Sequence, residues 1–243
     1  MNNYSKVMQE HGKSFFWASW FLDKNTANKL FTVYALCRRL DDLVDTSNEN
    51  SEAKEEIARV ISLTNNNQYK ETFEEFKSID SKLHPRQDII IEFLKGQLSD
   101  LDFRQPNDLG QLLKYCYRVA GVVGLMICDV LDIRDSKLRY FAIDFGIAMQ
   151  LTNICRDIKE DAQIGRIYLP KNETASLAIG NFRSPSNTDL IIINSSRDKL
   201  IKLADEYYQS GMYGINQLPI KIKRSFRVAS NIYQGIGHKI LQK

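Results

Sequence analysis

The sequence predicts an all-α protein. Apolar residues recur at three- and four-residue steps along most of the 243-residue chain, which is the period of an amphipathic helix. Alternation of apolar and polar residues, which marks a half-buried strand, is almost absent. Residues 190–193 are the nearest strand candidate, and they could equally begin a helix. Hydrophobic residues make up 43% of the chain, which is enough for a sizeable core.

Turn-forming residues divide this helical pattern into about eight segments. The periodicity is clear at residues 30–40 and again at 141–152. Breaks are expected at residues 46–50, 64–68, 84–85, 105–107, 169–170 and 218–219. The polar stretch 171–188 is interpreted as a surface excursion. Because no repeat or flexible linker is visible, we expect one domain, residues 1–243.

Composition restricts the partners and the compartment. The net charge is only +3, so no strong positive field favours nucleic acid, and no obligate protein partner is evident. The four cysteines lie in apolar helical patterns without zinc or disulfide spacing, which predicts reduced core residues: Cys37, Cys116, Cys128 and Cys155. No signal layout and no run of about 18 apolar residues is present. We expect a cytoplasmic protein, and a peripheral contact at the inner face of the membrane stays open.

The first candidate site is an acid cluster near residue 41. On a helix Asp41 and Asp45 share one face with Arg38, about 6 Å from turn to turn, whereas Asp42 is rotated by about 100°. One interpretation is a metal site, because a divalent cation with oxygen ligands removes the repulsion between the acids. The other is a charged helix end, although acids there oppose the helix dipole. Both interpretations stay open for this helix alone.

The second acid cluster gives a sharper pattern. Asn153, Asp157 and Asp161 step by four along one helical stripe, and Gln150 adjoins it one turn earlier. Neutral and charged oxygens in a row suit Mg²⁺ shared with a phosphate group. The hydrophobic run before the cluster predicts a buried helix, and buried carboxylates need partners.

Basic residues adjoin the second cluster. Arg156 lies beside the stripe and Arg166 follows Gly165, and a guanidinium can hold diphosphate oxygens in pairs. Two acid helices facing across a cleft, with cations and arginines, are suited to the ionisation of an allylic diphosphate. The carbocation that results requires a dry pocket, for which the chain offers many apolar helical faces.

Long motifs identify a family. The second acid cluster closely resembles the second signature of the squalene and phytoene synthase family, and the first resembles its first aspartate-rich signature. In chain order the matching segments are residues 13–16, 34–45, 115–124, 150–161, 165–170 and 208–233. The resemblance spans Ser14 to about Tyr233. The segment that follows the second signature is most similar to bacterial phytoene synthases.

The resemblance implies an isoprenoid-synthase helical bundle around a central apolar cavity. It also implies Mg²⁺ dependence, with Mn²⁺ as an alternative, and prenyl diphosphates as substrates. Two geranylgeranyl diphosphates would condense head to head (1′–1) through a cyclopropylcarbinyl diphosphate to phytoene, a step of carotenoid biosynthesis. That product forms by proton loss, so no NADPH is expected.

The family's functional residues carry over by position. The implied Mg²⁺ ligands are Asp41, Asp45, Asn153, Asp157 and Asp161, with Asp42 in support. The implied diphosphate contacts are Arg38, Arg156 and Ser14, and the implied neighbours of the reacting carbons are Tyr34, Tyr115, Tyr117 and Gln150. Gly121 and Gly124 lie where the family's chain approaches the prenyl tail. For these glycines, close helix packing is the alternative explanation.

Alternatives remain within and outside this function. A farnesyl-using squalene, presqualene diphosphate or dehydrosqualene synthase would share the mechanism, and the sequence does not show the length of the pocket. A third hypothesis is a non-catalytic helical assembly protein, but family members of that kind lack the acids present here. Relatives usually continue with further basic helical sequence, so the chain is interpreted as truncated at its C-terminus. Lys239 and Lys243 are the nearest candidates to supply that charge.

Overall fold

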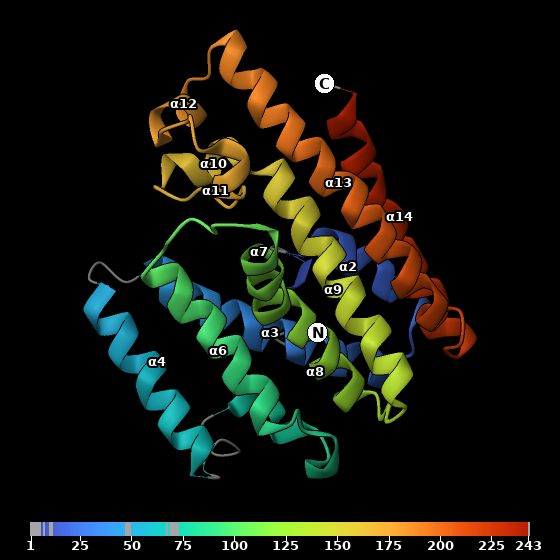
Figure 1. Cartoon of the computed structure of the whole chain (residues 1–243). Coiled ribbons are helices and arrows are strands. Elements are labelled where there is room, and N and C mark those ends of the chain that lie inside the picture. Colours follow the sequence, from blue (N-terminus) through green and yellow to red (C-terminus); the bar gives the residue numbers. More distant parts are fainter. Residues whose placement is uncertain are drawn as a thin grey trace.

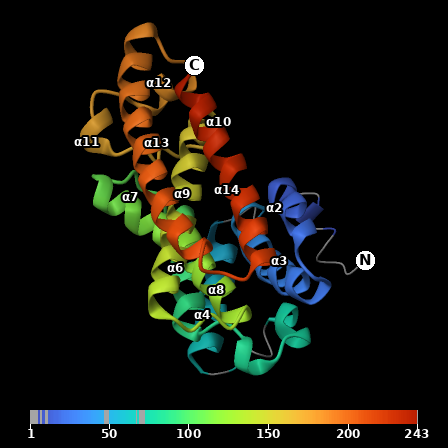
Figure 2. The same cartoon turned by 90° about the vertical axis from the view of Figure 1, so that its right-hand side faces the viewer.

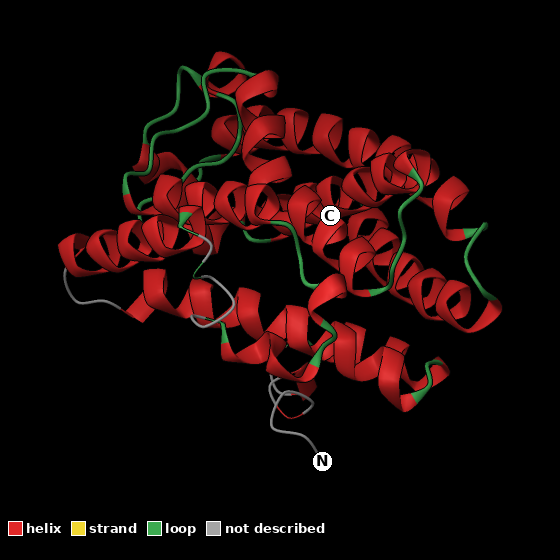
Figure 3. Ribbon diagram, turned by 90° about the horizontal axis from the view of Figure 1, so that it is seen from below, coloured by secondary structure: helices red, strands yellow, loops and turns green. Residues whose placement is uncertain are grey.

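The computed structural model is helical throughout the part of the chain that it describes, residues 6, 8–9, 12–46, 50–66, 68 and 73–242. Within that part, the side chains of residues 13–15, 43–46, 50 and 78 are not described. Figure 3 shows helices and loops there and no strand. The prediction of an all-α protein is therefore confirmed, and residues 190–193 lie inside a long helix.

The described helices outnumber the eight segments expected. The α-helices are α2 (Lys13–Ala18), α3 (Lys24–Thr46), α4 (Asn50–Asn65), α6 (Gln87–Leu101), α7 (Leu109–Cys116), α8 (Val122–Val130), α9 (Ser136–Arg156), α10 (Ile158–Gln163), α11 (Lys171–Thr174), α12 (Ile179–Arg183), α13 (Asn187–Ile215) and α14 (Ile220–Leu241). Short 3-10 helices are η1 (Ser19–Phe21), η2 (Glu74–Ser78) and η3 (Ser81–Leu83), and η4 (Tyr117–Gly121) is π-helical. The polar stretch 171–188 contains two of the short helices, and its Phe182 is buried.

Three long helices form one side of the molecule. The helix α13 packs along α9, and α14 packs against both, as Figures 1 and 2 show from two directions. The other side is formed by α3, α4, α6 and α8, which enclose a core that includes Leu36, Phe93 and Met126. Local caps set the helix starts: the Asp135 carboxylate accepts from the Leu138 N–H at the start of α9, and Ser186 forms a capping box with Asp189 before α13.

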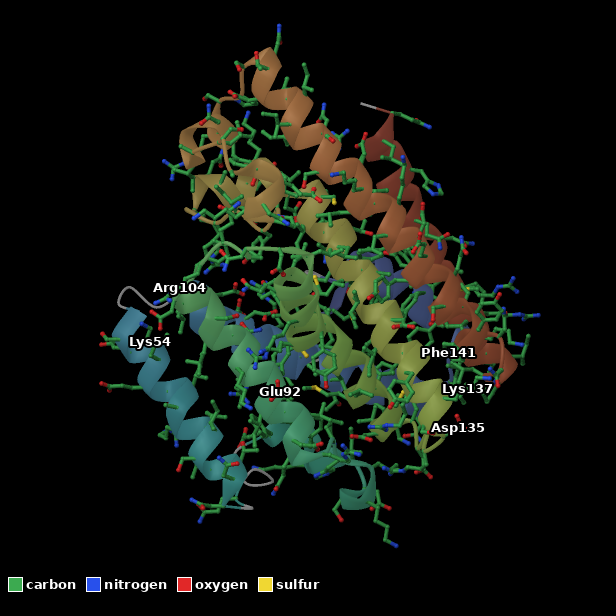
Figure 4. All side chains as sticks on the ribbon, viewed as in Figure 1. Lys54, Glu92, Arg104, Asp135, Lys137 and Phe141 are labelled. Atoms are coloured by element: carbon green, nitrogen blue, oxygen red, sulfur yellow. The ribbon has the colours of Figure 1, made fainter. Side chains whose placement is uncertain are left out.

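Polar contacts hold the smaller helices to this frame. The Lys54 ammonium pairs with Asp102 at 2.5 Å and joins α4 to the end of α6. The Glu92 carboxylate, midway along α6, pairs with Arg118 of η4 at 3.1 Å. Figure 4 labels Lys54 and Glu92 on their helices. All four cysteines are free and buried, which confirms the prediction for them. A membrane crossing would need a long, uniformly apolar helix, and the described part of the chain contains none.

Candidate active site

A mainly apolar cavity of about 270 Å³ lies between the two sides of the molecule. Its wall comes from α3, η4, α8, α9, α13 and α14, with Ala18 and Ser19 at one edge. Aromatic and aliphatic side chains supply most of the surface, among them Phe141, Phe145, Met149 and Phe226. Such a space suits a hydrocarbon chain, because burying apolar surface in it contributes about 25 cal/mol per Å².

Polar groups meet this cavity along α9 and its neighbours. Gln150 and Asn153 line it from the end of α9, Tyr34 lines it from α3, and Tyr233 lines it from α14. The Oδ1 atom of Asn153 is buried and has no hydrogen-bond partner among the described residues. A buried amide oxygen without a partner costs free energy, so this atom fits a bound ligand.

The second acid stripe continues from Asn153 across a helix break. The sequence pattern treats residues 150–161 as one helix, whereas the structure ends α9 at Arg156 and begins α10 at Ile158. The register survives, since the Asp157 N–H donates to the Asn153 carbonyl at 2.9 Å and the Asp161 N–H to the Asp157 carbonyl at 2.8 Å. Asn153, Asp157 and Asp161 therefore remain one turn apart along one stripe.

Close like charge perturbs the last acid of the stripe. Burial, followed by the charge of Asp157, raises the pKa of Asp161 to about 7, and the charge of Arg166 opposes this rise. A carboxylate that is both desolvated and beside another carboxylate is poised for a cation.

Arg166 reaches Asp161 through a tight turn after α10. Gly165 has φ +89°, which only glycine adopts easily. The Arg166 N–H then donates to the Asp161 carbonyl at 2.9 Å and the Gly165 N–H to the Ala162 carbonyl at 3.2 Å. This is a Schellman motif. It turns the chain back at the end of α10, so that Arg166 lies near Asp161, whose pKa its charge lowers.

Arg156 bridges the stripe and the cavity. Its guanidinium donates to both carboxylate oxygens of Asp157, at 2.7 and 2.6 Å, and also hydrogen-bonds Tyr233. Burial raises the pKa of Tyr233, so this hydroxyl stays protonated near neutral pH.

The first acid helix approaches from α3. The Gln97 amide of α6 donates to Asp41 Oδ1 at 2.8 Å, and Arg38 pairs with Asp42 at 2.5 Å along one helix face. The Nε atom of Arg38 is buried and lacks a hydrogen-bond partner in the described part of the chain, which leaves a donor suited to an anion. The side chains of Asp45 and Ser14 lie outside the described residues.

Tyr34 faces the cavity one turn before Arg38. Burial is the largest cause that raises the pKa of Tyr34, to about 12. The charge of Arg38 lowers this pKa, whereas Tyr233 and Asp41 raise it. Tyr34 therefore lies close enough to Arg38 and Asp41 on its own helix, and to Tyr233 of α14, for their charges to act on it.

Two predicted tyrosines make their contacts outside the described cavity. Tyr115 and Tyr117 are not among the residues that line the described cavity, although we expect them near the reacting carbons. The Tyr115 hydroxyl instead donates to Asp100 at 2.9 Å, and its ring stacks on Tyr168. Tyr117 packs between the two cores and contacts Gly121. Tyr115 lies in α7, before the π-helical turn, whereas Tyr117 begins η4, whose extra residue changes the direction of the side chains that follow it.

Gly121 and Gly124 are positions of close helix packing. A Cβ on Gly124 would collide with the Ala142 carbonyl of α9, and one on Gly121 would lie 3.1 Å from Ile143 Cγ2. Gly146 of α9 approaches the Ala120 carbonyl in the same way. Of the two predicted glycines, only Gly124 also lines the cavity, so packing and proximity to the cavity coincide there.

The donor set fits Mg²⁺ at the second stripe. It consists of oxygens only, with one unpartnered amide oxygen and two carboxylates of which one is desolvated. The described side chains contain no group of three or more His, Cys, Asp or Glu close enough to form a metal site by themselves. A cation here would draw on the Asn153 amide oxygen as well as on the two carboxylates.

Four contacts around the site were not predicted from the sequence. They involve Gln97, Asp100, Tyr168 and Tyr233, whose partners are distant along the chain. Lys239, proposed to supply extra charge, is exposed in the last turn of α14, and Lys243 lies outside the described residues.

Comparison with known proteins decides the family. A family model described as squalene/phytoene synthase matches residues 8–243. The chain belongs to the squalene/phytoene synthase family. It is 30% identical to 15-cis-phytoene synthase of Pantoea ananas, with 100% of this chain and 82% of that protein covered. It is 32% identical to 15-cis-phytoene synthase of Enterobacter agglomerans, over 97% of this chain and 84% of that protein.

Solved structures agree with this assignment. A dehydrosqualene synthase in complex with a ligand has a TM-score of 0.78 at 30% identity, over 95% of this chain and 82% of that one. Squalene synthase HpnC of Alicyclobacillus acidocaldarius has a TM-score of 0.81 at 17% identity, over 98% and 92% of the two chains, which shows the shared fold alone. This member of the family is a prenyltransferase-type enzyme, and the resemblance stated from the sequence is confirmed.

Proposed function

We propose that this enzyme joins two geranylgeranyl diphosphates head to head to form phytoene in a Mg²⁺-dependent reaction. The observation that supports this most is the position of Asn153. This residue lines the apolar cavity and also begins the stripe that leads to Asp157 and Asp161. A prenyl diphosphate has the same two parts, an apolar chain joined to a polyanion.

The ligands for the cation would come from both acid helices. Asn153, Asp157 and Asp161 would hold Mg²⁺ on one side, and Asp41 with Asp45 on the other. Bound Mg²⁺ supplies charge neutralisation for the leaving diphosphate. The fit is supported by the desolvated Asp161 carboxyl and the unpartnered Asn153 oxygen.

The protein's own groups would hold the diphosphate and protect the cation. Arg38 and Arg156 would bind the phosphate oxygens, since a guanidinium binds such oxygens in pairs. The buried Nε of Arg38 supports this role, and Arg156 would have to exchange its present partner Asp157 for the substrate. The apolar wall excludes water, which would otherwise capture the allylic cation before the second prenyl group reacts. Tyr34, Gln150 and Tyr233 supply the polar edge of the cavity, where the reacting carbons would lie.

The product assignment draws on the relatives. Two curated relatives at 30% and 32% identity are named 15-cis-phytoene synthases. A farnesyl-using synthase is the second candidate, because a dehydrosqualene synthase structure matches at 30% identity. Both candidates use the same acids and differ in the length of chain that the cavity accepts.

Product analysis tests the proposal. Purified protein would be incubated with geranylgeranyl diphosphate or with farnesyl diphosphate, each with Mg²⁺ and with a chelator, and the extracts analysed by mass spectrometry. We expect a forty-carbon hydrocarbon from the longer substrate with Mg²⁺ only. A thirty-carbon product from farnesyl diphosphate alone would support the second candidate. No Mg²⁺-dependent product from either substrate would refute both.

A further inference from the structure

The helix α6 contacts both halves of the candidate active site. Gln97 and Asp100 lie three residues apart on this helix, so they are neighbours on its surface. Gln97 faces the first acid helix, and Asp100 faces the segment after the second acid stripe. Neither residue lines the described cavity, so any influence on the reaction would act through other residues.

Gln97 fixes the carboxylate of Asp41. The side chain of Gln97 is 4% exposed, and its Nε2 donates to Asp41 Oδ1 at 2.8 Å. A buried amide that donates to a carboxylate restricts its rotation, because rotation away would leave the amide hydrogen without an acceptor. The orientation of Asp41 therefore depends on α6.

Asp100 fixes two tyrosines. Its Oδ2 accepts from the Tyr115 hydroxyl at 2.9 Å, and its Oδ1 accepts from the Tyr168 hydroxyl at 2.8 Å. The two rings stack with centroids 4.9 Å apart and planes 26° apart. Both oxygens of one carboxylate are thus engaged by a rigid aromatic pair.

This pair lies beside the basic residue next to the second stripe. Tyr168 follows Arg166 by two residues, and Arg166 Nη2 donates to the Asp100 carbonyl at 3.3 Å. The Arg166 N–H also donates to the Asp161 carbonyl at 2.9 Å, so the position of this segment is tied to the second stripe. Asp100 thereby holds the segment 166–168 and sets where Arg166 lies relative to Asp161.

We propose that Gln97 and Asp100 are positioning residues that hold the two acid clusters in the arrangement that binds Mg²⁺ with diphosphate. The inference rests on the proposed function. It adds that α6, through Gln97 and Asp100, connects the two acid clusters; we call this connection the brace. Residues that orient metal ligands from outside typically change metal affinity 10- to 100-fold when they are replaced. The brace predicts an effect of that size from residues that touch no substrate.

The test compares three single variants with a matched control. Gln97→Leu removes the donor to Asp41. Asp100→Asn replaces the carboxylate whose two oxygens accept from the tyrosines with an amide that has only one acceptor oxygen. Tyr168→Phe keeps the ring stack, deletes one of the two hydrogen bonds, and replaces Asp100→Asn if that variant does not fold. Asp102→Asn is the control, because Asp102 follows the last residue of the same helix, is exposed, and pairs with Lys54 of α4.

Two readouts separate positioning from a merely structural role. One is the Mg²⁺ concentration that gives half-maximal turnover, and the other is calorimetric binding of Mg²⁺ in the presence of inorganic diphosphate. We expect about a tenfold weakening of both in Gln97→Leu and Asp100→Asn, a smaller one in Tyr168→Phe, and none in Asp102→Asn.

The outcomes distinguish this inference from the proposed function. If the wild-type protein turns over with Mg²⁺ while the Gln97 and Asp100 variants keep wild-type Mg²⁺ dependence and binding, the brace is wrong, even if their melting temperatures fall. If the wild-type protein shows no Mg²⁺-dependent turnover, the proposed function fails. Calorimetry then still decides whether α6 controls cation and diphosphate binding.

Discussion

Arg156 holds both carboxylate oxygens of its sequence neighbour Asp157, at 2.7 and 2.6 Å. Adjacent residues on a regular helix point about 100° apart, so this pairing depends on the break between α9 and α10, where Asp157 has φ −103° and ψ 16°. In the metal-free protein the guanidinium neutralises one acid of the stripe. A cation at Asp157 would displace it and leave Arg156 available to an anionic substrate.

This relationship predicts the effect of removing the guanidinium. Arg156→Gln should raise KM for the prenyl diphosphate about tenfold or more, because a charge-assisted contact to phosphate is lost. Binding of Mg²⁺ without substrate should not weaken, because a competitor for Asp157 has gone. Steady-state kinetics and calorimetry measure the two effects, and an unchanged KM together with weaker Mg²⁺ binding would contradict the assignment.

Replacement of a stripe carboxylate should greatly reduce turnover and leave the fold intact. Asp157→Asn keeps the side-chain shape, but it removes charge stabilisation that contributes several kcal/mol to the transition state. We expect turnover to fall by about two orders of magnitude or more. Glu160→Gln on the same helix is the control, because this exposed acid is off the stripe. Equal activity in both variants would show that the stripe is not catalytic.

The perturbed Asp161 carboxyl predicts a pH-dependent stability in the absence of Mg²⁺. In the unfolded chain this group ionises near pH 3.8, whereas in the folded protein its pKa is about 7. Between these values the folded state retains a proton that the unfolded state has lost, so stability falls as pH rises through this window and stays reduced above it.

Asp161→Asn should therefore melt at a higher temperature than wild type at pH 8 in a chelator, with little difference near pH 4. Thermal melts followed by circular dichroism measure this, with Glu206→Gln at an exposed position of α13 as the control. Each kcal/mol gained by relieving the repulsion and the desolvation should raise the melting temperature by about 2–4 °C. An equal or lower melting temperature at pH 8 would mean that Asp161 is not destabilising.

The local part of the site could be predicted from the sequence, and its supporting contacts could not. The spacing of Asn153, Asp157 and Asp161 places them on one stripe because helical geometry is local, and the stripe persists even across the break at Asp157. The bond from Gln97 to Asp41 joins two helices that are distant in sequence, and no local pattern marks it. Only the packing of α6 against α3 brings these residues together.

The positions of Tyr115 and Tyr117 illustrate a second limit. The resemblance to the family implies a place near the reacting carbons for both, but η4 is π-helical, and no feature of the sequence gives its position. One extra residue in a turn redirects the side chains around it. Tyr115 lies in α7, ahead of this turn, and it meets Asp100 of α6 through a contact between helices that no local pattern marks.

Because α9 and η4 approach closely, replacing glycine with alanine should change stability in opposite directions at two positions. Gly146→Ala should destabilise the protein by about 1–3 kcal/mol, because the new Cβ would collide with the Ala120 carbonyl. Gly235→Ala in α14 should stabilise it by about 0.5–1 kcal/mol, because this helical position is open. Urea denaturation measures both, and equal effects would show that α9 and η4 are not in such close contact.

A larger side chain in the cavity wall should shift the preference of the enzyme towards the shorter substrate. Val123→Phe enlarges a partly exposed side chain in the cavity wall, so we expect turnover of geranylgeranyl diphosphate to fall more than that of the shorter farnesyl diphosphate. Val228→Phe on α14 is the control, since Val228 does not line the described cavity. Competition between the two substrates gives the ratio of kcat/KM directly. An unchanged ratio would mean that this part of the cavity does not hold the prenyl chain.

The central claim is that the two acid clusters bind divalent cations, together with a diphosphate, at the polar end of the cavity. Crystals grown with Mn²⁺ and an unreactive prenyl thiodiphosphate would test it by anomalous scattering. The account predicts manganese peaks within about 2.0–2.6 Å of oxygens of Asn153, Asp157 and Asp161, with the prenyl chain in the cavity. Ordered thiodiphosphate in another place, or no manganese at these side chains, would contradict it.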